Sequence, residues 1–220
     1  KHDFPVEFVG HPLIDAIHNK KLIDAPTFRK ENDLEEKPII AILPGSRKQE
    51  ITKMLSVMLG VVDDFTDYQF VIAGAPSQDY DLYEPFLKSK NVHFIANKTY
   101  DLLSHSTAAL VTSGTATLET ALFKVPEVVC YKGSWVSYQI AKRIITLKYI
   151  SLVNLIMDEE VVTELIQEKC NSRNISVELK KIIEPNHRNH VLKKYDILES
   201  KLGGIGASKK TAQLIIRNLK

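Results

Sequence analysis

The sequence has 220 residues, of which 44% are hydrophobic and 25% charged, a composition typical of a globular domain. Lys and Arg total 29 against 27 Asp and Glu, and a net charge of +2 provides no overall field to recruit nucleic acid. The cysteines Cys130 and Cys170 lie in no metal-binding spacing, and no apolar run is long enough to span a bilayer. Reduced thiols favour a cytoplasmic location. The start, KHDFP, resembles neither an initiator sequence nor a signal peptide, so we expect the chain to begin inside a longer protein.

Short apolar runs alternate with helix-length amphipathic segments between Pro38 and Tyr131, which predicts βα units and a parallel sheet. Five strands are expected, at Ile39–Leu43, Gln69–Ala73, Val92–Ile95, Ala108–Val111 and Glu127–Tyr131. Helices are expected between them at Lys48–Asp63, Tyr80–Lys88, Tyr100–His105 and Thr115–Phe123. Ahead of the first strand, Val6–Val9 is either a strand or a connector, and the charged segment Ala25–Lys37, with Pro26, is expected to be a loop.

The pattern changes to helices after Tyr131. They are expected at Ser137–Leu147, Glu159–Glu168, Val177–Ile183, His187–Lys201 and Ala207–Leu219. The glycines of Gly203–Gly206 follow a helix and lack the strand before a phosphate loop, so we interpret them as a connector. We therefore expect an α/β chain with a lead-in over residues 1–36, a βα core over 37–132 and a helical portion over 133–220.

The first candidate binding segment leaves the strand Ile39–Leu43 and enters a helix, at the place where open parallel sheets bind ligands. Its candidate residues are Pro44, Gly45, Ser46 and Arg47. Gly45 allows a ligand to approach the backbone closely, and Arg47 supplies a forked cation suited to phosphate. Ser46 with Gln49 is also consistent with an ordinary capping box, so the pattern alone leaves anion binding and helix capping open.

The second candidate segment is again a strand, a hydroxyl-rich turn and a helix. Ser113, Gly114 and Thr115 make a donor-rich turn at a helix N-terminus, which suits a diphosphate. With Thr115 as N-cap, Glu119 lies one place beyond the capping-box position, and we expect it to accept hydrogen bonds from a ribose diol. The alternative is an acidic residue that stabilises the positive end of the helix.

Weaker signals accompany these two turns. Gly74 ends another strand with a small-residue turn, and Ala96–Tyr100 follows a strand where a base is conjectured to lie. His11 is either structural or a donor to a ligand between two domains. We find no acidic cluster with metal-ligand spacing and no general base, so we expect no metal and no cofactor, and catalytic residues that lie elsewhere.

The segment Ala141–Ile150 interleaves cations and an aromatic residue with aliphatic residues. Two interpretations remain open: a stretch that lies on an anionic membrane surface, or an amphipathic helix packed on the sheet. The following segment is apolar enough to be buried, and Asn154 within it then needs a partner.

Taken together, five segments resemble bacterial lipid-A-disaccharide synthase. They occur in order and are FVGHPLID (Phe8–Asp15), ILPGSRKQEI (Ile42–Ile51), TSGTATLETAL (Thr112–Leu122), VPEVVCYK (Val125–Lys132) and YISLVNLI (Tyr149–Ile156). The joint occurrence is specific, and it covers roughly the carboxyl-terminal half of that family.

The resemblance implies a GT-B architecture, in which two Rossmann-like domains face across a cleft. This chain would be the donor-binding half with additional C-terminal helices, and the N-terminal acceptor domain is absent. The family transfers diacylglucosamine from UDP-2,3-diacylglucosamine to lipid X (2,3-diacylglucosamine 1-phosphate), with inversion and without metal. The products are a β-1,6 disaccharide and UDP. The presumed general base, an Asp, belongs to the other half.

The resemblance also implies roles for single residues. Ser46 and Arg47 would stand at the donor diphosphate, with Arg47 stabilising the leaving group, and Glu119 would stand at the ribose. Asn154 and Gln167 would belong to a conserved carboxyl-terminal stretch of the donor site. The chain departs from the family pattern here, because it lacks the Pro before Asn154 and has Thr163 where a Pro-Glu step would begin.

Family members are peripheral to the cytoplasmic face of the inner membrane, and some dimerise through carboxyl-terminal elements. The resemblance therefore implies a UDP-sugar, an acceptor held by the other domain, an anionic membrane surface and a homodimer as partners, without nucleic acid. Two alternatives remain: another UDP-N-acetylglucosamine-using GT-B protein, such as the lipid II transferase or a UDP-sugar epimerase, and a non-catalytic nucleotide-binding module.

Overall fold

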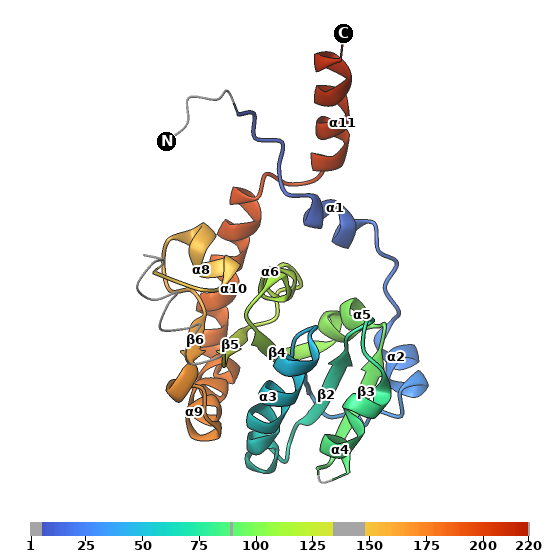
Figure 1. Cartoon of the computed structure of the whole chain (residues 1–220), viewed down its shortest axis with the longest axis vertical. Coiled ribbons are helices and arrows are strands. Elements are labelled where there is room, and N and C mark those ends of the chain that lie inside the picture. Colours follow the sequence, from blue (N-terminus) through green and yellow to red (C-terminus); the bar gives the residue numbers. More distant parts are fainter. Residues whose placement is uncertain (1–5, 89, 134–147, 220) are drawn as a thin grey trace.

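A six-stranded, fully parallel sheet forms the centre of the chain in the computed structural model, which describes residues 6–88, 90–133 and 148–219 (Figure 1). The strand order is β3-β2-β1-β4-β5-β6. The strands are β1 (Ile39–Leu43), β2 (Gln69–Gly74), β3 (Val92–Ala96), β4 (Ser106–Thr112), β5 (Glu127–Tyr131) and β6 (Thr163–Ile166). The first five confirm the expected strands, with ends that differ by at most two residues. Each is rich in apolar residues because helices cover both faces of the sheet.

The sixth strand replaces an expected helix. The prediction of a helix over Glu159–Glu168 is wrong, because Thr163–Ile166 pairs in parallel with β5, with Val128 opposite Thr163 and Tyr131 opposite Ile166. The acidic residues of this segment favour a helix locally, whereas pairing with the open edge of β5 satisfies its backbone groups as a strand. A 3-10 helix, η3 (Gln167–Lys169), follows it directly.

Alternate residues of each strand point to opposite layers. From β1, Ile40 and Ile42 join a core cluster with α3 (Lys48–Met58) and α9 (Ser172–Ile183), whereas Ile39 and Ala41 pack on the other face. That second layer contains α2 (Ala25–Glu31) and α5 (Thr99–Ser104). Next to it, α6 (Thr115–Leu122), α8 (Leu152–Met157) and α10 (Pro185–Lys201) surround Val129 of β5. The shorter elements are η1 (Leu59–Asp64), η2 (Tyr80–Leu82) and α4 (Glu84–Leu87).

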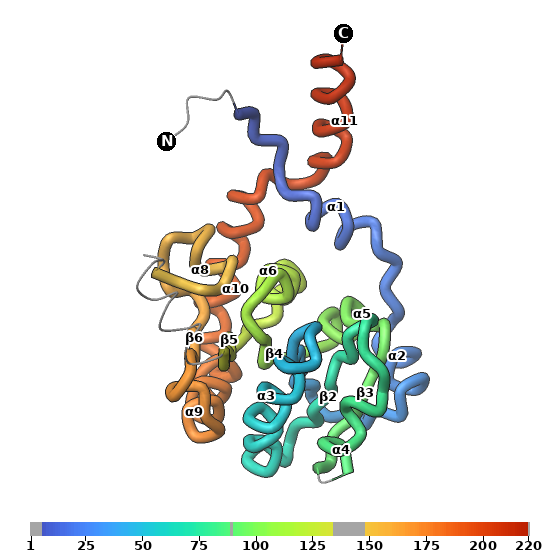
Figure 2. The backbone as a smooth tube through the Cα atoms, in the orientation of Figure 1, coloured from blue at the N-terminus to red at the C-terminus, as the bar shows by residue number. Residues whose placement is uncertain are grey.

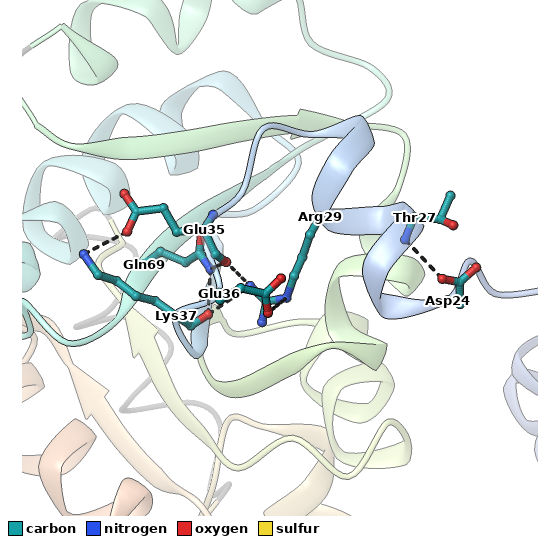
Figure 3. Close-up of polar contacts among 7 residues, drawn as sticks. All are labelled: Asp24, Thr27, Arg29, Glu35, Glu36, Lys37 and Gln69. Carbon is teal, nitrogen blue, oxygen red and sulfur yellow. Dashed lines mark hydrogen bonds and ion pairs between the residues drawn. The ribbon is translucent and has the colours of Figure 1, made fainter.

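The lead-in to β1 is helical where a loop was expected. Asp24 caps α2 by accepting a hydrogen bond from the Thr27 amide at 3.1 Å, and Pro26 lies in the first turn, where its missing N–H costs no bond. The connection to β1 is held by Gln69, whose Nε2 donates to the carbonyls of Glu35 and Lys37 at 2.6 Å (Figure 3). Arg29 also donates to both carbonyls. These tertiary bonds explain why a charged segment is ordered here.

The first and last described segments lie together at one end of the molecule (Figure 2). Residues 6–11 form a connector rather than a strand, and His11 caps α1 (Pro12–His18) by accepting a bond from the Leu13 amide at 3.2 Å. The glycine-rich segment connects α10 to α11 (Ala207–Asn218), as expected. Asp15 accepts hydrogen bonds from the amides of Gly206 and Ser208.

The carboxyl-terminal helices match the expected ones in part. Helix α9 begins five residues before the expected Val177, and α10 begins at Pro185. The expected helix Ser137–Leu147, and most of the segment Ala141–Ile150, lie outside the described residues. Among the helices that the structure describes, none has the length and apolarity to cross a membrane.

Candidate functional site

A cavity of about 220 Å³ lies at the carboxyl edge of the sheet, where the strand order changes direction between β1 and β4. Loops that follow β1, β2 and β4 line it. Seven of the residues predicted from the sequence surround this cavity: Gly45, Ser46, Gly74, Ser113, Gly114, Thr115 and Glu119. The structure thus brings together residues that are far apart in the sequence, because parallel strands all end at the same edge.

The β1–α3 turn is built around Gly45, whose φ of +107° disfavours any other residue. A Cβ at Gly45 would lie 2.9 Å from Oε2 of Glu50. Arg47, rather than Ser46, is the N-cap of α3, and Oε2 of Glu50 accepts from the Arg47 amide at 3.4 Å. The expected capping box from Ser46 to Gln49 is therefore wrong by one residue, and Glu50, which also lines the cavity, was not identified from the sequence.

Pro44 and Arg47 are not among the residues that line the cavity. The Arg47 side chain is 83% exposed and lies 3.4 Å from the Glu50 carboxylate. An exposed pair at this distance contributes little stability, so a phosphate can compete for the guanidinium. The contact between Arg47 and a diphosphate stays a prediction.

The β4–α6 turn begins its helix one residue earlier than expected. Gly114 is the N-cap and Thr115 the first helical residue, so Glu119 is even further from the capping-box position. The Ser113 hydroxyl donates to the Ile150 carbonyl at 2.9 Å and can still accept a bond. Thr112, at the end of β4, lines the cavity, and its Oγ1 is buried without a partner in the described part of the chain. Thr112 ends an apolar strand, and the sequence pattern alone does not indicate that such a residue faces a binding cavity.

Glu119 reaches the cavity from α6, and Tyr100 reaches Glu119 from α5. The Tyr100 phenol donates a hydrogen bond of 2.7 Å to Oε1 of Glu119. Burial raises the pKa of the Tyr100 phenol, and its bond to the nearby carboxylate raises it further. The phenol therefore keeps its proton across the physiological range. The sequence placed Tyr100 near a nucleotide base but did not identify this pairing.

Asn154 lies away from the cavity lining, and its amide is fully used within the protein. Its Nδ2 donates to the Val162 carbonyl at 2.8 Å and to Glu164 Oε1 at 2.9 Å. Its Oδ1 accepts from the amides of Val161 and Val162 at 2.8 and 3.0 Å. No hydrogen-bonding capacity is left over for a ligand. These bonds give Asn154 a structural role, and its expected donor contact stays a prediction.

Gln167 follows β6 with a φ of +52° and is nearly buried, but it does not line the cavity. Its Nε2 has no hydrogen-bond partner among the residues that the structure describes. A buried amide without a hydrogen bond destabilises the fold, so Gln167 is a candidate for contact with a ligand or with a group outside the described residues. Its expected donor contact stays a prediction.

The cavity lining carries acidic side chains but no basic one among the residues that the structure describes. The charged residues that line it are Glu50 and Glu119, so any attraction for an anion comes from backbone amides at the starts of α3 and α6 and from hydroxyls. Arg47 follows the lining residue Ser46 directly and has an exposed side chain. Such a site suits a ligand that carries both an anionic group and hydroxyl groups.

Comparison with known proteins gives a consistent result. A family model described as Lipid-A-disaccharide synthetase matches residues 1–216. A lipid-A-disaccharide synthase from Syntrophus aciditrophicus (strain SB) is 36% identical over 227 residues, with 98% of this chain and 58% of that protein covered. One from Coxiella burnetii (strain CbuG_Q212) is 34% identical over 220 residues with the same coverage. The chain spans 58% of the length of these curated relatives.

Solved structures with similar folds are nucleotide-sugar enzymes. The S. aureus MnaA-UDP co-structure has a TM-score of 0.62 at 17% identity, with 96% of this chain and 52% of that chain covered. UDP-GlcNAc 2-epimerase from Neisseria meningitidis, bound to UDP-GlcNAc, has a TM-score of 0.58 at 19% identity, with 95% and 54% covered. At these identities the likeness shows the fold, which is that of one half of a GT-B protein, as expected.

Proposed function

Because this chain belongs to the lipid-A-disaccharide synthetase family, we propose that it forms the donor-binding part of an inverting glycosyltransferase of lipid A synthesis. The proposed reaction transfers diacylglucosamine from UDP-2,3-diacylglucosamine to 2,3-diacylglucosamine 1-phosphate and releases UDP. The observation that carries the proposal is the convergence of the β1–α3 and β4–α6 turns, with Glu119, around one cavity. The proposal is also supported by the UDP and the UDP-GlcNAc that two proteins of similar fold bind.

The arrangement supports a specific binding mode. The diphosphate would lie between the two turns, where the first amides of α6 and the hydroxyls of Ser46 and Thr115 are available donors. Glu119 would accept from the ribose. Arg47 is exposed next to Ser46 and would turn from Glu50 to the diphosphate as negative charge develops on departing UDP. Such preorganised donors stabilise a leaving group most where water is excluded.

The remaining parts of the reaction are proposed to lie outside this chain. We infer that the general base and the acceptor-binding residues belong to the part of the relatives' length that this chain does not span. We also propose a cytoplasmic location at the inner membrane face, a contact with anionic lipid, and a homodimer. The resemblance supports these proposals, and they remain separate from the nucleotide site.

Calorimetric titration with UDP and UDP-N-acetylglucosamine, at moderate salt and without added metal, tests the nucleotide site. We expect saturable binding of both ligands, and loss of at least tenfold in affinity for Arg47→Ala, about 1.4 kcal/mol. Arg217→Ala is the matched control, because Arg217 is an exposed cation whose partner, Glu7, is far from the cavity. A folded chain that binds neither ligand would contradict the proposal.

A further inference from the structure

Tyr100 contacts the cavity residue Glu119 without lining the cavity itself. Glu119 lines the cavity, whereas Tyr100 is not among the lining residues. Their hydrogen bond of 2.7 Å occupies one lone pair of Oε1, and Oε2 has no partner within the described part of the chain. The carboxylate is therefore held at one oxygen and open at the other.

The Tyr100 ring is itself held by the helix that carries Glu119. Its centroid lies 5.1 Å from that of Phe123, with an angle of 50° between the rings. Phe123 follows Glu119 by four residues, one turn along α6, so both residues are on the same helix face. Tyr100 thus contacts Glu119 on α6 and Phe123 at its C-cap, so ring packing fixes the position of the phenol oxygen in addition to the hydrogen bond.

A carboxylate held in this way binds a ligand in one fixed orientation and with a smaller loss of side-chain entropy than a free one. A free Glu side chain loses rotamer freedom when it binds, whereas a side chain already held by a neighbour does not. The two hydroxyls of a ribose are a matched pair of donors for a fixed carboxylate. Removing either one leaves an acceptor unpaired in a partly desolvated site, which is strongly disfavoured.

We propose that Tyr100 is a positioning residue that fixes the Glu119 carboxylate for the ribose diol and so makes the site select ribonucleotides over deoxyribonucleotides. This inference rests on the proposed function, because it assigns the specificity of the same nucleotide site. Tyr100 does not touch the nucleotide, and it acts only through Glu119.

A double-mutant cycle between the protein and the ligand tests the proposal. Wild type and Tyr100→Phe are each titrated with UDP and with 2′-deoxy-UDP. We expect wild type to prefer UDP by about tenfold or more, and Tyr100→Phe to reduce this preference to about twofold, mainly by weakening UDP. In the Glu119→Gln background, Tyr100→Phe is expected to change the preference no further.

Two controls separate positioning from a general effect on folding. The ring of Tyr100→Phe still packs on Phe123, and its thermal unfolding is compared with that of wild type. Tyr195→Phe removes a hydroxyl from a ring buried in the core around α10 and should leave the preference for UDP unchanged.

The possible outcomes are distinct. If wild type binds neither nucleotide, the proposed function is wrong. If wild type binds UDP but Tyr100→Phe weakens UDP and 2′-deoxy-UDP by the same factor, or weakens neither, the positioning role of Tyr100 is overturned while the proposed function stands.

Discussion

The carboxylate of Asp15 accepts hydrogen bonds from the backbone amide of Ser208 at 2.8 Å and from that of Gly206 at 2.6 Å. A side chain of the first helix therefore caps the start of the last one. The Asp15 carboxylate accepts hydrogen bonds from backbone N–H groups at the start of α11 that have no partner within that helix.

We expect the docking of α11 to depend on pH through Asp15. The two amide bonds lower the pKa of Asp15 below its ordinary value of 3.8. The folded pKa is depressed, so the stabilisation is fully present above pH 3.8 and is lost as the pH falls through the folded pKa. The protection of α11 amides, measured as the exchange rate relative to the intrinsic rate at each pH, should fall over that acid range. Asp15→Asn should raise exchange at neutral pH and abolish the pH dependence, and an unchanged profile would contradict the role of the cap.

Glycine is required in one of the two turns at the cavity and not in the other. Gly45→Ala is expected to lower the free energy of unfolding by about 1–3 kcal/mol, because φ is +107° and the new Cβ would press on Glu50. Gly114→Ala is the matched control, since a Cβ there meets nothing within 4 Å. Urea denaturation of both variants provides the comparison, and equal effects would show that backbone strain at Gly45 is unimportant.

Asn154→Ala distinguishes a structural role from a ligand contact. Removal of the side chain leaves the amides of Val161 and Val162 without their acceptor, so we expect a loss of about 2–4 kcal/mol in unfolding free energy. UDP affinity of the folded protein should change less than twofold. A drop in affinity with unchanged stability would restore the donor contact that the sequence suggested.

Glu127 is expected to destabilise the protein at neutral pH. It is buried on β5, both of its carboxylate oxygens lack partners among the described residues, and burial raises its pKa well above the ordinary value of 4.5. The folded state then holds a proton that the unfolded state releases, so stability falls as the pH rises above 4.5 toward the folded pKa.

Glu127→Met removes this titration while preserving most of the volume. We expect Glu127→Met to be more stable than wild type by about 1–3 kcal/mol at pH 7 and to lose that advantage near pH 4, measured by chemical denaturation at several pH values. An advantage that is the same at every pH would show that it comes from packing alone.

The central strands β1 and β2 were predictable from the sequence because they are buried along their whole length and carry continuous apolar runs, as in Ile39–Leu43. Helix α2 and strand β6 were not. They are short, and they depend on contacts from elsewhere in the chain: Gln69 and Arg29 order the segment after α2, and the edge of β5 pairs with β6. Local sequence preference predicts secondary structure poorly where contacts with distant parts of the chain determine whether a short segment forms a helix or a strand.

The site was predictable to the level of its turns. A glycine and hydroxyl residues after a buried strand identified both turns, but not the residue at which each helix begins. Thr112 and Tyr100 were missed because their roles depend on a cavity and on a partner in another helix. Family resemblance supplied the expected contact of Asn154, and the structure instead shows its amide satisfied by its own loop.

The strand order also has a consequence for biosynthesis. Within this sheet, β2 and β3 add in one direction from β1, and β4, β5 and β6, which are synthesised later, add in the other. One edge of β1, made of apolar residues with unpaired backbone groups, therefore stays open until β4 has been synthesised. Such an edge can pair with other chains, so we expect nascent chains that stop before β4 to aggregate or to bind chaperones, and this tendency to fall as β4, β5 and β6 cover the edge in turn.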